Sequence, residues 1–280
     1  MELSLNADRH VLGLSGGRDS AALAVFMRQQ YPELDIEYFF TDTGKELPEV
    51  HEFLVRLEGF LGKPIQRLNP ERDFDFWLSS YNNFLPSPKM RWCTRQLKIR
   101  PFEQWLKSDL AAGKHVNSYV AIRSDEPHRE GHTSTQPGLR TQFPFRIHGV
   151  DLRGVKELLE GSGVGLPAYY RWRSRSGCTF CFFQQRIEWV RLKREHPAAF
   201  EEAKQYEKLA RDHASPFTWV ENESLEELER PERVAEIEQR HEQRLARIAS
   251  NRRLGPLETA SQTEDMTEIG NDTGCSICHK

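Results

Sequence analysis

The feature that most constrains this chain of 280 residues is a six-residue loop, Ser15-Gly16-Gly17-Arg18-Asp19-Ser20, directly after the apolar run Val11–Leu14. A short apolar run is typical of a buried strand, and the residues that open at Ser20 have the composition of a helix. A turn with two glycines lets its backbone approach a bound anion, and the first N–H groups of a helix attract phosphate. The order strand, loop, helix therefore predicts a nucleotide-binding site.

The loop differs from the phosphate loop that ends in Gly-Lys-Ser/Thr. The three Gly-Lys pairs of the chain are followed by Glu46, Pro64 and His115, so none has the hydroxyl residue that such a loop requires. Residues 15–20 resemble instead the SGGxDS pyrophosphate loop of the adenine nucleotide alpha hydrolases. This resemblance implies that ATP is cleaved between its α and β phosphates, which gives an adenylated intermediate and pyrophosphate. The alternative is a Gly-Gly turn that binds no ligand.

Composition narrows the class of protein. The net charge of −3 argues against a protein that coats nucleic acid over its whole surface. The mean hydropathy of −0.69, without any run of transmembrane length, predicts a cytoplasmic protein that makes no membrane contact. Because disulfides are rare in that compartment, the five cysteines need another role.

Apolar runs and amphipathic stretches alternate along the first part of the chain. We expect four strands, near residues 11–14, 36–40, 64–68 and 118–122. The alternation predicts an α/β fold with a parallel twisted sheet and helices on both faces, which is Rossmann-like and similar to the adenine nucleotide alpha hydrolases. The predicted domains are a nucleotide-binding domain, a helical extension and a flexible tail, at residues 1–195, 196–250 and 251–280.

Polar segments follow three of the predicted strands. Ligands of parallel sheets bind beyond the carboxyl ends of the strands, so residues 15–20, 41–44 and 123–126 should face one cleft. Asp42 is placed to meet a ribose or a metal ion, and a carboxylate that caps the following turn is the alternative. The polar stretch at residues 127–142 predicts a mobile loop over that cleft.

Cations and aromatic rings alternate in Tyr169–Arg175, and further basic residues follow at Arg186, Arg191, Lys193 and Arg194. Such a stretch can grip a phosphate chain and stack on bases, which would give DNA contact through a local patch. The same charges also suit a role in balancing a thiolate-bound cluster or an anionic nucleotide. The sequence leaves both interpretations open.

Cysteine spacing is the second informative pattern. Cys93 stands alone, whereas Cys178 with Cys181, and Cys275 with Cys278, each form a C-x-x-C pair. Two pairs and a single cysteine are compatible with a four-thiolate zinc site, an iron–sulfur cluster or a dithiol that cycles to a disulfide. The two pairs are far apart in the sequence, which disfavours a compact zinc knuckle.

The residues around these cysteines resemble a family. Residues 91–101, 121–126 and 176–181, together with the first loop and Thr43-Gly44, have the order and spacing seen in the phosphoadenosine phosphosulfate (PAPS) reductase family. Some members of that family contain a [4Fe–4S] cluster that cysteines at these places bind. The resemblance implies that the cluster ligands here are Cys93, Cys178 and Cys181.

The chain departs from that family in one important respect. Cluster-containing members have two adjacent cysteines at the first position, where this chain has Cys93 alone. The fourth iron is then bound by the tail, through Cys275 or Cys278, or is left open to hold sulfide. The reductases also carry a nucleophilic cysteine on a C-terminal tail, which makes Cys278, beside His279, a candidate sulfur carrier. A tail whose cysteines have no function is the alternative.

The motifs resemble most the ATP pyrophosphatase component of bacterial DNA phosphorothioation systems of the Dnd and Ssp kinds. This implies a sulfurtransferase that adenylates an acceptor oxygen and supports sulfur insertion, with ATP, Mg²⁺ and a [4Fe–4S] cluster. The implied partners are a cysteine desulfurase or another sulfur donor protein, other DNA-modification subunits, and DNA. The alternatives are a sulfonucleotide reductase that releases sulfite, a tRNA thiolation enzyme, and a non-catalytic nucleotide-binding subunit.

Each site residue has a role in this hypothesis. Phosphate is bound by Ser15, Gly16, Gly17 and Ser20, and Thr43 and Gly44 belong to the same nucleotide site. Arg18 neutralises charge, Asp19 orients the loop or assists Mg²⁺, and Arg123 stabilises pyrophosphate as it departs.

Overall fold

The computed structural model describes residues 3–129, 131, 136–175, 177–212 and 217–251. Within these residues the chain forms two compact units. The first unit contains residues 3–77 and 91–179, and the second contains residues 78–90 and 180–251. The predicted domain boundaries at 195 and 250 stay predictions. No helix in the described part of the chain combines the length and the apolar composition that a membrane crossing requires.

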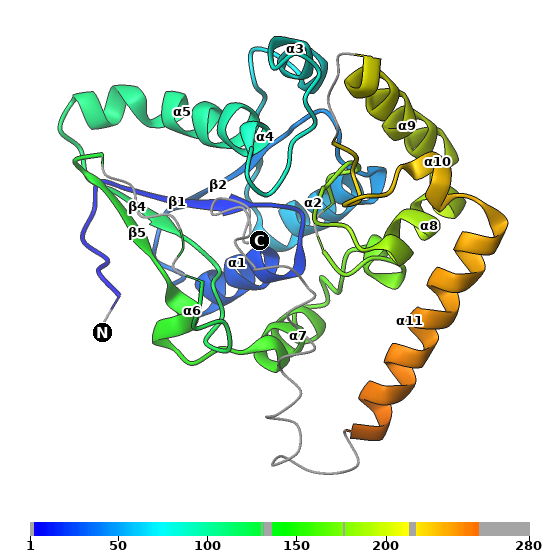
Figure 1. Ribbon diagram of the computed structural model, residues 1–280. Coiled ribbons are helices and arrows are strands. Elements are labelled where there is room, and N and C mark those ends of the chain that lie inside the picture. The colour runs from blue at the N-terminus through cyan, green and yellow to red at the C-terminus, as the bar shows by residue number, and fades with distance from the viewer. Residues whose placement is uncertain (1–2, 130, 132–135, 176, 213–216, 252–280) are drawn as a thin grey trace. The chain divides into compact units, whose positions relative to one another are not determined.

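Five parallel strands form the sheet of the first unit, in the order β3-β2-β1-β4-β5 (Figure 1). The strands are β1 Arg9–Leu14, β2 Ile36–Thr41, β3 Ile65–Leu68, β4 Val116–Tyr119 and β5 Leu139–Gln142. β1 lies at the centre, so that Leu12 is opposite Tyr38 of β2 on one side and Tyr119 of β4 on the other. The predicted α/β fold with a parallel sheet is confirmed.

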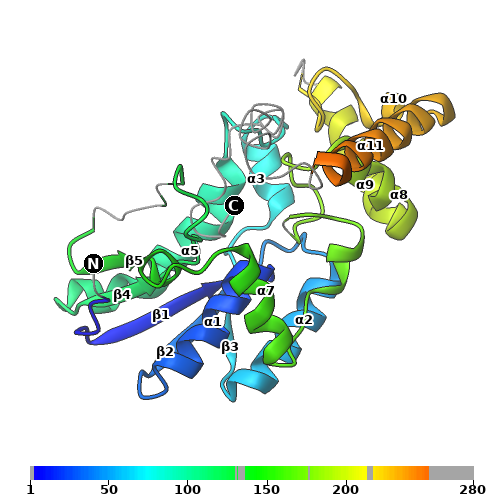
Figure 2. The ribbon, with the colours of Figure 1, turned by 90° about the horizontal axis from the view of Figure 1, so that it is seen from below.

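The helical segments that begin in the first unit are α1 Arg18–Gln30, α2 Pro48–Leu61, α3 Phe74–Ser80, α4 Trp92–Thr94, η1 Arg95–Ile99, α5 Arg100–Ala111, α6 Pro144–Ile147, α7 Leu152–Gly161 and η2 Ala168–Arg171. The longer helices pack on the sheet, whose side chains alternate between two faces. Phe39 packs against α5, where its ring lies 4.8 Å from that of Phe102. Phe40 packs against α2, with its ring 6.0 Å from that of His51. Figures 1 and 2 show α5 on one side of the sheet and α1 with α7 on the other, which confirms the predicted two-sided cover.

The edge strand β5 lies in the segment that the sequence predicts as a mobile loop, residues 127–142. That prediction is wrong for the last four of these residues, which pair with β4. Leu139 is the one apolar residue of this strand, and it is buried. A four-residue edge strand with a single apolar side chain has too little periodicity to be recognised from sequence.

The second unit is helical, with α8 Arg186–Glu195, α9 Pro197–Asp212, α10 Leu225–Leu228 and α11 Pro231–Asn251. A capping box formed by Ser224 and Glu227 begins α10. Trp189, Phe200 and Leu225 are fully buried in this unit. The predicted helical C-terminal region is confirmed as far as residue 251, and the predicted tail lies outside the described residues.

Candidate functional site

The loop between β1 and α1 is the starting point of the candidate site. Gly16 has a φ of +71°, and a Cβ added there would lie 2.4 Å from Cγ1 of Val50, so the position requires glycine. α1 begins at Arg18, two residues before the predicted start at Ser20. Gly17 is the N-cap residue and supplies no side-chain hydrogen bond to the helix. The N–H groups of Ser15, Gly17 and Arg18 donate to Ser20 Oγ, Ser15 Oγ and Tyr170 OH, so an anion would be attracted here by the positive end of α1 and by the Arg18 side chain.

Two serines close the loop on itself. Ser20 Oγ lies 3.1 Å from Ser15 Oγ and donates a hydrogen bond to the Gly17 carbonyl at 3.2 Å. The N–H of Ser15 donates to Ser20 Oγ at 3.1 Å. Ser20 is buried, so its hydroxyl fixes the shape of the loop. Phosphate binding by either serine stays a prediction.

Two arginines near the loop differ in how their hydrogen-bond donors are used. Arg123 donates to Asp19 at 3.2 Å and to Asp125 at 2.8 Å, and its Nη2 lies 3.4 Å from Glu126. Burial acts to lower the pKa of Arg123, but these carboxylates raise it above its ordinary value. Arg18 Nε is buried and donates to no described residue, and Asp19 Oδ1 is 3.8 Å away from it. Arg18 therefore has an unused donor, whereas Arg123 is already neutralised and its role toward pyrophosphate stays a prediction.

The loop after β2 lies at the carboxyl edge of the sheet, as predicted. Asp42 Oδ1 accepts a hydrogen bond from the Gly44 N–H at 2.9 Å, so Asp42 caps the turn in this structure. Thr43 Oγ1 donates to Glu46 Oε1 at 3.0 Å, and Lys98 Nζ lies 3.9 Å from the same oxygen. Burial raises the pKa of Glu46, and the charge of Lys98 opposes that rise. A role for Asp42 toward a ribose or a metal ion stays a prediction.

Residues 169–175, 177 and 178 form a segment that we call the strap, and its first residues contact the loop. Tyr169 OH donates to the Gly16 carbonyl at 3.1 Å, and the Arg18 N–H donates to Tyr170 OH at 3.3 Å. The Arg18 guanidinium lies over the Tyr170 ring, 5.2 Å from its centroid. The strap is therefore fixed to the loop by hydrogen bonds at two consecutive tyrosines.

The far end of the strap is attached to the loop after β2. Cys178 forms an antiparallel β-bridge with Glu46. Val50 packs between the strap and the first loop, because a Cβ added at Gly177 would lie 2.0 Å from Val50 Cγ2 and one at Gly16 would lie 2.4 Å from Val50 Cγ1. Gly16 of the first loop and Gly177, the residue before Cys178, therefore both lie against Val50.

The predicted basic and aromatic patch begins in the strap, and several of its members are buried. Tyr169, Trp172 and Arg173 are 0%, 5% and 2% exposed. Burial raises the pKa of Tyr169 and of Tyr170. Because they are buried, these side chains do not form a surface that a nucleic-acid strand could contact. Arg171 is exposed and available to a partner, and nucleic-acid contact through the patch stays a prediction.

The predicted cluster ligands are divided between the two units. Cys93 on α4 and Cys178 on the strap belong to the first unit, and Cys181 belongs to the second. None of the three forms a disulfide within the described residues. Thiolates are suitable cluster ligands, yet no three His, Cys, Asp or Glu side chains gather around a metal position in the part of the chain that is described. Cys275 and Cys278 lie outside the described residues, and the [4Fe–4S] cluster stays a prediction.

An anionic nucleotide suits the groups that the structure does bring together. Arg18 supplies a buried donor that has no acceptor among the described residues, α1 directs its positive end toward the loop, and Gly16 leaves no room for a side chain. The sequence motifs do not point to Glu46 or Val50. Their only sequence signal is their place just after the predicted strand end, because their contacts are with residues more than a hundred positions later, Cys178 and Gly177.

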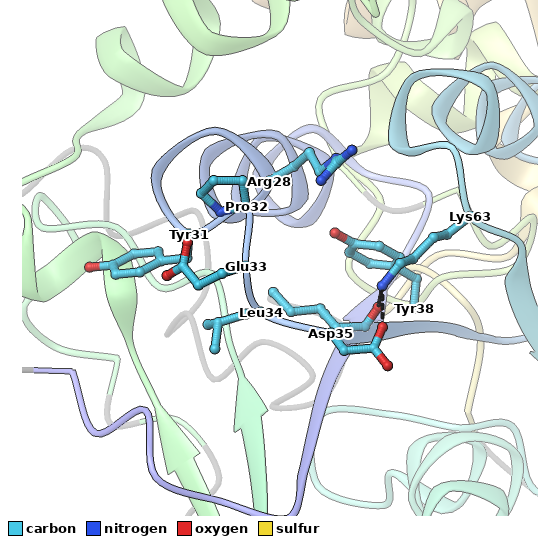
Figure 3. Close-up of a pocket in the computed structure, with 9 residues that line it drawn as sticks. Arg28, Tyr31, Pro32, Glu33, Leu34, Asp35, Tyr38 and Lys63 are labelled. Carbon is cyan, nitrogen blue, oxygen red and sulfur yellow. Dashed lines mark hydrogen bonds and ion pairs between the residues drawn. The ribbon is translucent and has the colours of Figure 1, made fainter.

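A hollow of about 150 Å³ lies apart from this site (Figure 3). It is lined by the end of α1, the connection to β2, and Tyr38 and Lys63. Lys63 is paired with Asp35 there, and burial raises the pKa of Tyr38 to about 12. Because β1 and β2 are parallel, this hollow lies at the amino end of the sheet, opposite the loop at residues 15–20. It is therefore not part of the candidate site.

One protein family matches the part of the chain that contains the first loop and strands β1 to β4. Residues 9–141, just under half of the chain, match the sequence profile of the phosphoadenosine phosphosulfate reductase domain. No curated protein sequence matches the chain.

Two solved structures are similar at low identity. PAPS reductase from Candida auris, in a phosphate complex, is 12% identical with a TM-score of 0.48 over 61% of this chain and 81% of that one. The U34-tRNA thiolase NcsA from Methanococcus maripaludis, with its [4Fe–4S] cluster, is 13% identical with a TM-score of 0.42 over 80% of this chain and 81% of that one. These likenesses are too low to assign a ligand or an activity. The profile match contains the first loop and strands β1 to β4, so this part of the chain is similar to the PAPS reductase domain.

Proposed function

We propose that the first unit binds ATP at residues 15–20 and that the chain is an ATP-dependent sulfur-transfer enzyme. The observation that carries this proposal is the buried Nε of Arg18, the first residue of α1, which has no acceptor among the described residues. A polyphosphate supplies an acceptor oxygen to this donor, and the N-terminal end of α1 attracts its charge. The PAPS reductase-like domain around the loop supports a reaction of an adenine nucleotide.

In the proposed reaction an acceptor oxygen attacks the α phosphorus of ATP. The bond from that phosphorus to the oxygen bridging to the β phosphorus breaks, and pyrophosphate leaves. The acceptor oxygen is then part of an adenylate, so a sulfide sulfur displaces it and AMP departs with that oxygen. Arg18 and the N–H groups of α1 stabilise the phosphate charge during the first step. Mg²⁺ accompanies ATP in this proposal, and none of these steps uses a cluster.

The proposed acceptor is a phosphate of DNA, in which one oxygen is replaced by sulfur. The support for this acceptor is the resemblance of residues 92–94, 97–99 and 178–184 to DNA phosphorothioation proteins. The proposed partners follow from it: a cysteine desulfurase or another sulfur donor protein, and other DNA-modification subunits. A cytoplasmic location is part of the same proposal.

The test is a product analysis on the full-length protein with ATP, Mg²⁺, DNA and a sulfide source under anaerobic conditions. We expect AMP and pyrophosphate in equal amounts. Production of ADP and orthophosphate would contradict the proposal, because the outer anhydride bond would then be the one cleaved. Sulfite released from adenylyl sulfate, without pyrophosphate from ATP, would establish the reductase alternative instead.

A further inference from the structure

Arg173 of the strap is buried with part of its hydrogen-bonding capacity unused. The residue is 2% exposed, and its Nη2 donates to the Cys178 carbonyl at 2.6 Å. Its Nε and Nη1 are buried and donate to no described residue. A guanidinium keeps its charge at any physiological pH, and unmet donors on a buried charge carry a large desolvation cost. These two donors therefore call for an acceptor that is not among the described residues.

The charges around Arg173 make that acceptor an anion. Glu46 is the buried carboxylate of this region, and it is already engaged by Thr43 Oγ1 at 3.0 Å and by Lys98 Nζ at 3.9 Å. The charges of Lys98 and Arg173 both act on Glu46, so these three groups together carry one net positive charge. An anion that accepts hydrogen bonds from Nε and Nη1 would supply both the missing charge and the missing acceptors.

The place of Arg173 restricts the size and the chemistry of this anion. Burial excludes a nucleic-acid strand from reaching the guanidinium, and the polyphosphate of the proposed reaction is assigned to Arg18. Arg173 donates to the backbone carbonyl of Cys178, and Cys178 forms a β-bridge with Glu46. A cysteine therefore lies next to the Arg173 guanidinium. The burial of Arg173 requires a small group, and its charge requires an anion. The proposed sulfur transfer makes a sulfur-containing anion the expected one.

We propose that Arg173 anchors a binding site for a small inorganic sulfur anion with a terminal sulfur, of the kind of hydrosulfide or thiosulfate. The proposal rests on the proposed function in one respect, since sulfur transfer is the reason to expect sulfur in the anion. The sulfur source in this proposal is an inorganic anion that the chain binds without forming a covalent bond.

The experiment is isothermal titration of the full-length, metal-free, reduced protein under anaerobic conditions, without ATP. Thiosulfate and hydrosulfide are titrated separately to distinguish the two sources, and sulfate and chloride are the comparison anions. We expect saturable binding of at least one sulfur anion, weakened about tenfold or more in Arg173→Met. Arg171→Met is the matched control, because that exposed arginine lies two residues earlier on the strap, and it should bind the anion as the wild type does.

A third variant keeps the test decisive if Arg173→Met does not fold. Arg173→Lys retains the charge but loses the planar set of donors, so it should fold and bind the anion with intermediate affinity. Absence of binding to the wild type, equal affinity in wild type and Arg173→Met, or equal binding of sulfate and chloride would each overturn the proposal. Pyrophosphate release by the wild type is measured separately, so failure of the proposed function and failure of the anion site give different results.

Discussion

Arg18 is the residue on which the nucleotide proposal depends most directly. Arg18→Met removes the buried Nε and its charge, so we expect the dissociation constant for ATP to rise about tenfold or more. Arg28→Met is the matched control, because Arg28 is an exposed residue in the last turn of the same helix. Fluorescence or calorimetric titration with ATP measures both variants. Unchanged ATP affinity in Arg18→Met would place the nucleotide elsewhere.

Gly177 and Val50 give a second prediction at this scale. A Cβ at Gly177 would meet Val50 Cγ2 at 2.0 Å, so Gly177→Ala should lower the free energy of unfolding by about 1–3 kcal/mol. Val50→Ala removes the opposing methyl groups. The double variant should therefore lose about 1 kcal/mol less unfolding free energy than the two single variants lose together. Urea unfolding measures the cycle. The same replacement at Gly16 should be relieved less by Val50→Ala, because the φ of +71° there stays strained for alanine. Additive effects of Gly177→Ala and Val50→Ala would show that the two residues do not meet.

These residues also show what the sequence can reveal of a site. The loop at residues 15–20 is predictable because its glycines, its strand and its helix are local features. Glu46 and Val50 are not predictable, because each takes its role from a partner distant in the chain, Cys178 and Gly177. In the sequence, Arg173 is one of several cations in a basic stretch. Only the structure shows that its Nε and Nη1 are buried without an acceptor among the described residues.

At the scale of elements, the central strands are predictable and the edge strand is not. β1 and β2 are covered on both faces and read as nearly continuous apolar runs, which is typical of buried parallel strands. β5 carries Leu139 alone as an apolar side chain and depends on pairing with β4. The pairing that creates an edge strand is a tertiary contact, so a local pattern does not report it.

The pairing of β1 with β4 contains a buried histidine that makes stability depend on pH. His10 Nδ1 lies 2.8 Å from Tyr119 OH, and burial lowers the pKa of His10 below its ordinary 6.5, against a weaker opposing effect of Asp35. The unfolded chain therefore takes up a proton, as the pH falls below about 6.5, that the folded protein does not. We expect the free energy of unfolding to decrease from pH 7.5 to pH 5.5, and part of that decrease to disappear in His10→Gln. Urea unfolding at the two pH values tests this, with the exposed His115→Gln as control. An identical pH dependence in wild type and His10→Gln would exclude His10 as the cause.

In the second unit, one carboxylate of α9 binds the N–H groups of Trp219 and of the first residue of α10. Glu207 is 1% exposed and accepts hydrogen bonds from the N–H groups of Trp219 at 2.9 Å and Leu225 at 2.8 Å. Glu207→Ala leaves both buried donors unsatisfied, so it should cost about 2–5 kcal/mol, and Glu207→Gln should cost less because one acceptor oxygen remains. Glu201→Ala on the same helix is the control, since its exposed pair with Lys204 is worth about 1 kcal/mol or less. Chemical denaturation ranks the three variants, and equal losses in Glu207→Ala and Glu201→Ala would contradict the assigned role.

For the whole molecule, the path of the chain differs from the simple succession of domains that its sequence predicts. The chain passes between the two compact units after residues 77, 90 and 179, so that residues 78–90 belong with the C-terminal helices. A short segment of this kind has no local signal, because its assignment depends on which residues it packs against. Each unit has buried residues of its own, such as Leu12 in the first and Trp189 in the second, and each can therefore unfold as a cooperative step.

The variants proposed above test that cooperative division directly. Differential scanning calorimetry of the wild type should resolve two transitions. Gly177→Ala alters the first unit and Glu207→Ala the second, so each should lower a different transition by several degrees and leave the other in place. The passages of the chain between the units, three of them within the described residues, do not prevent this, because a covalent connection does not by itself make two cores melt together. Two results would contradict this. Either variant could shift both transitions by the same amount, or the protein could show one transition that both variants lower. The chain would then unfold as one cooperative body, and the two units would not be separate in their thermal unfolding.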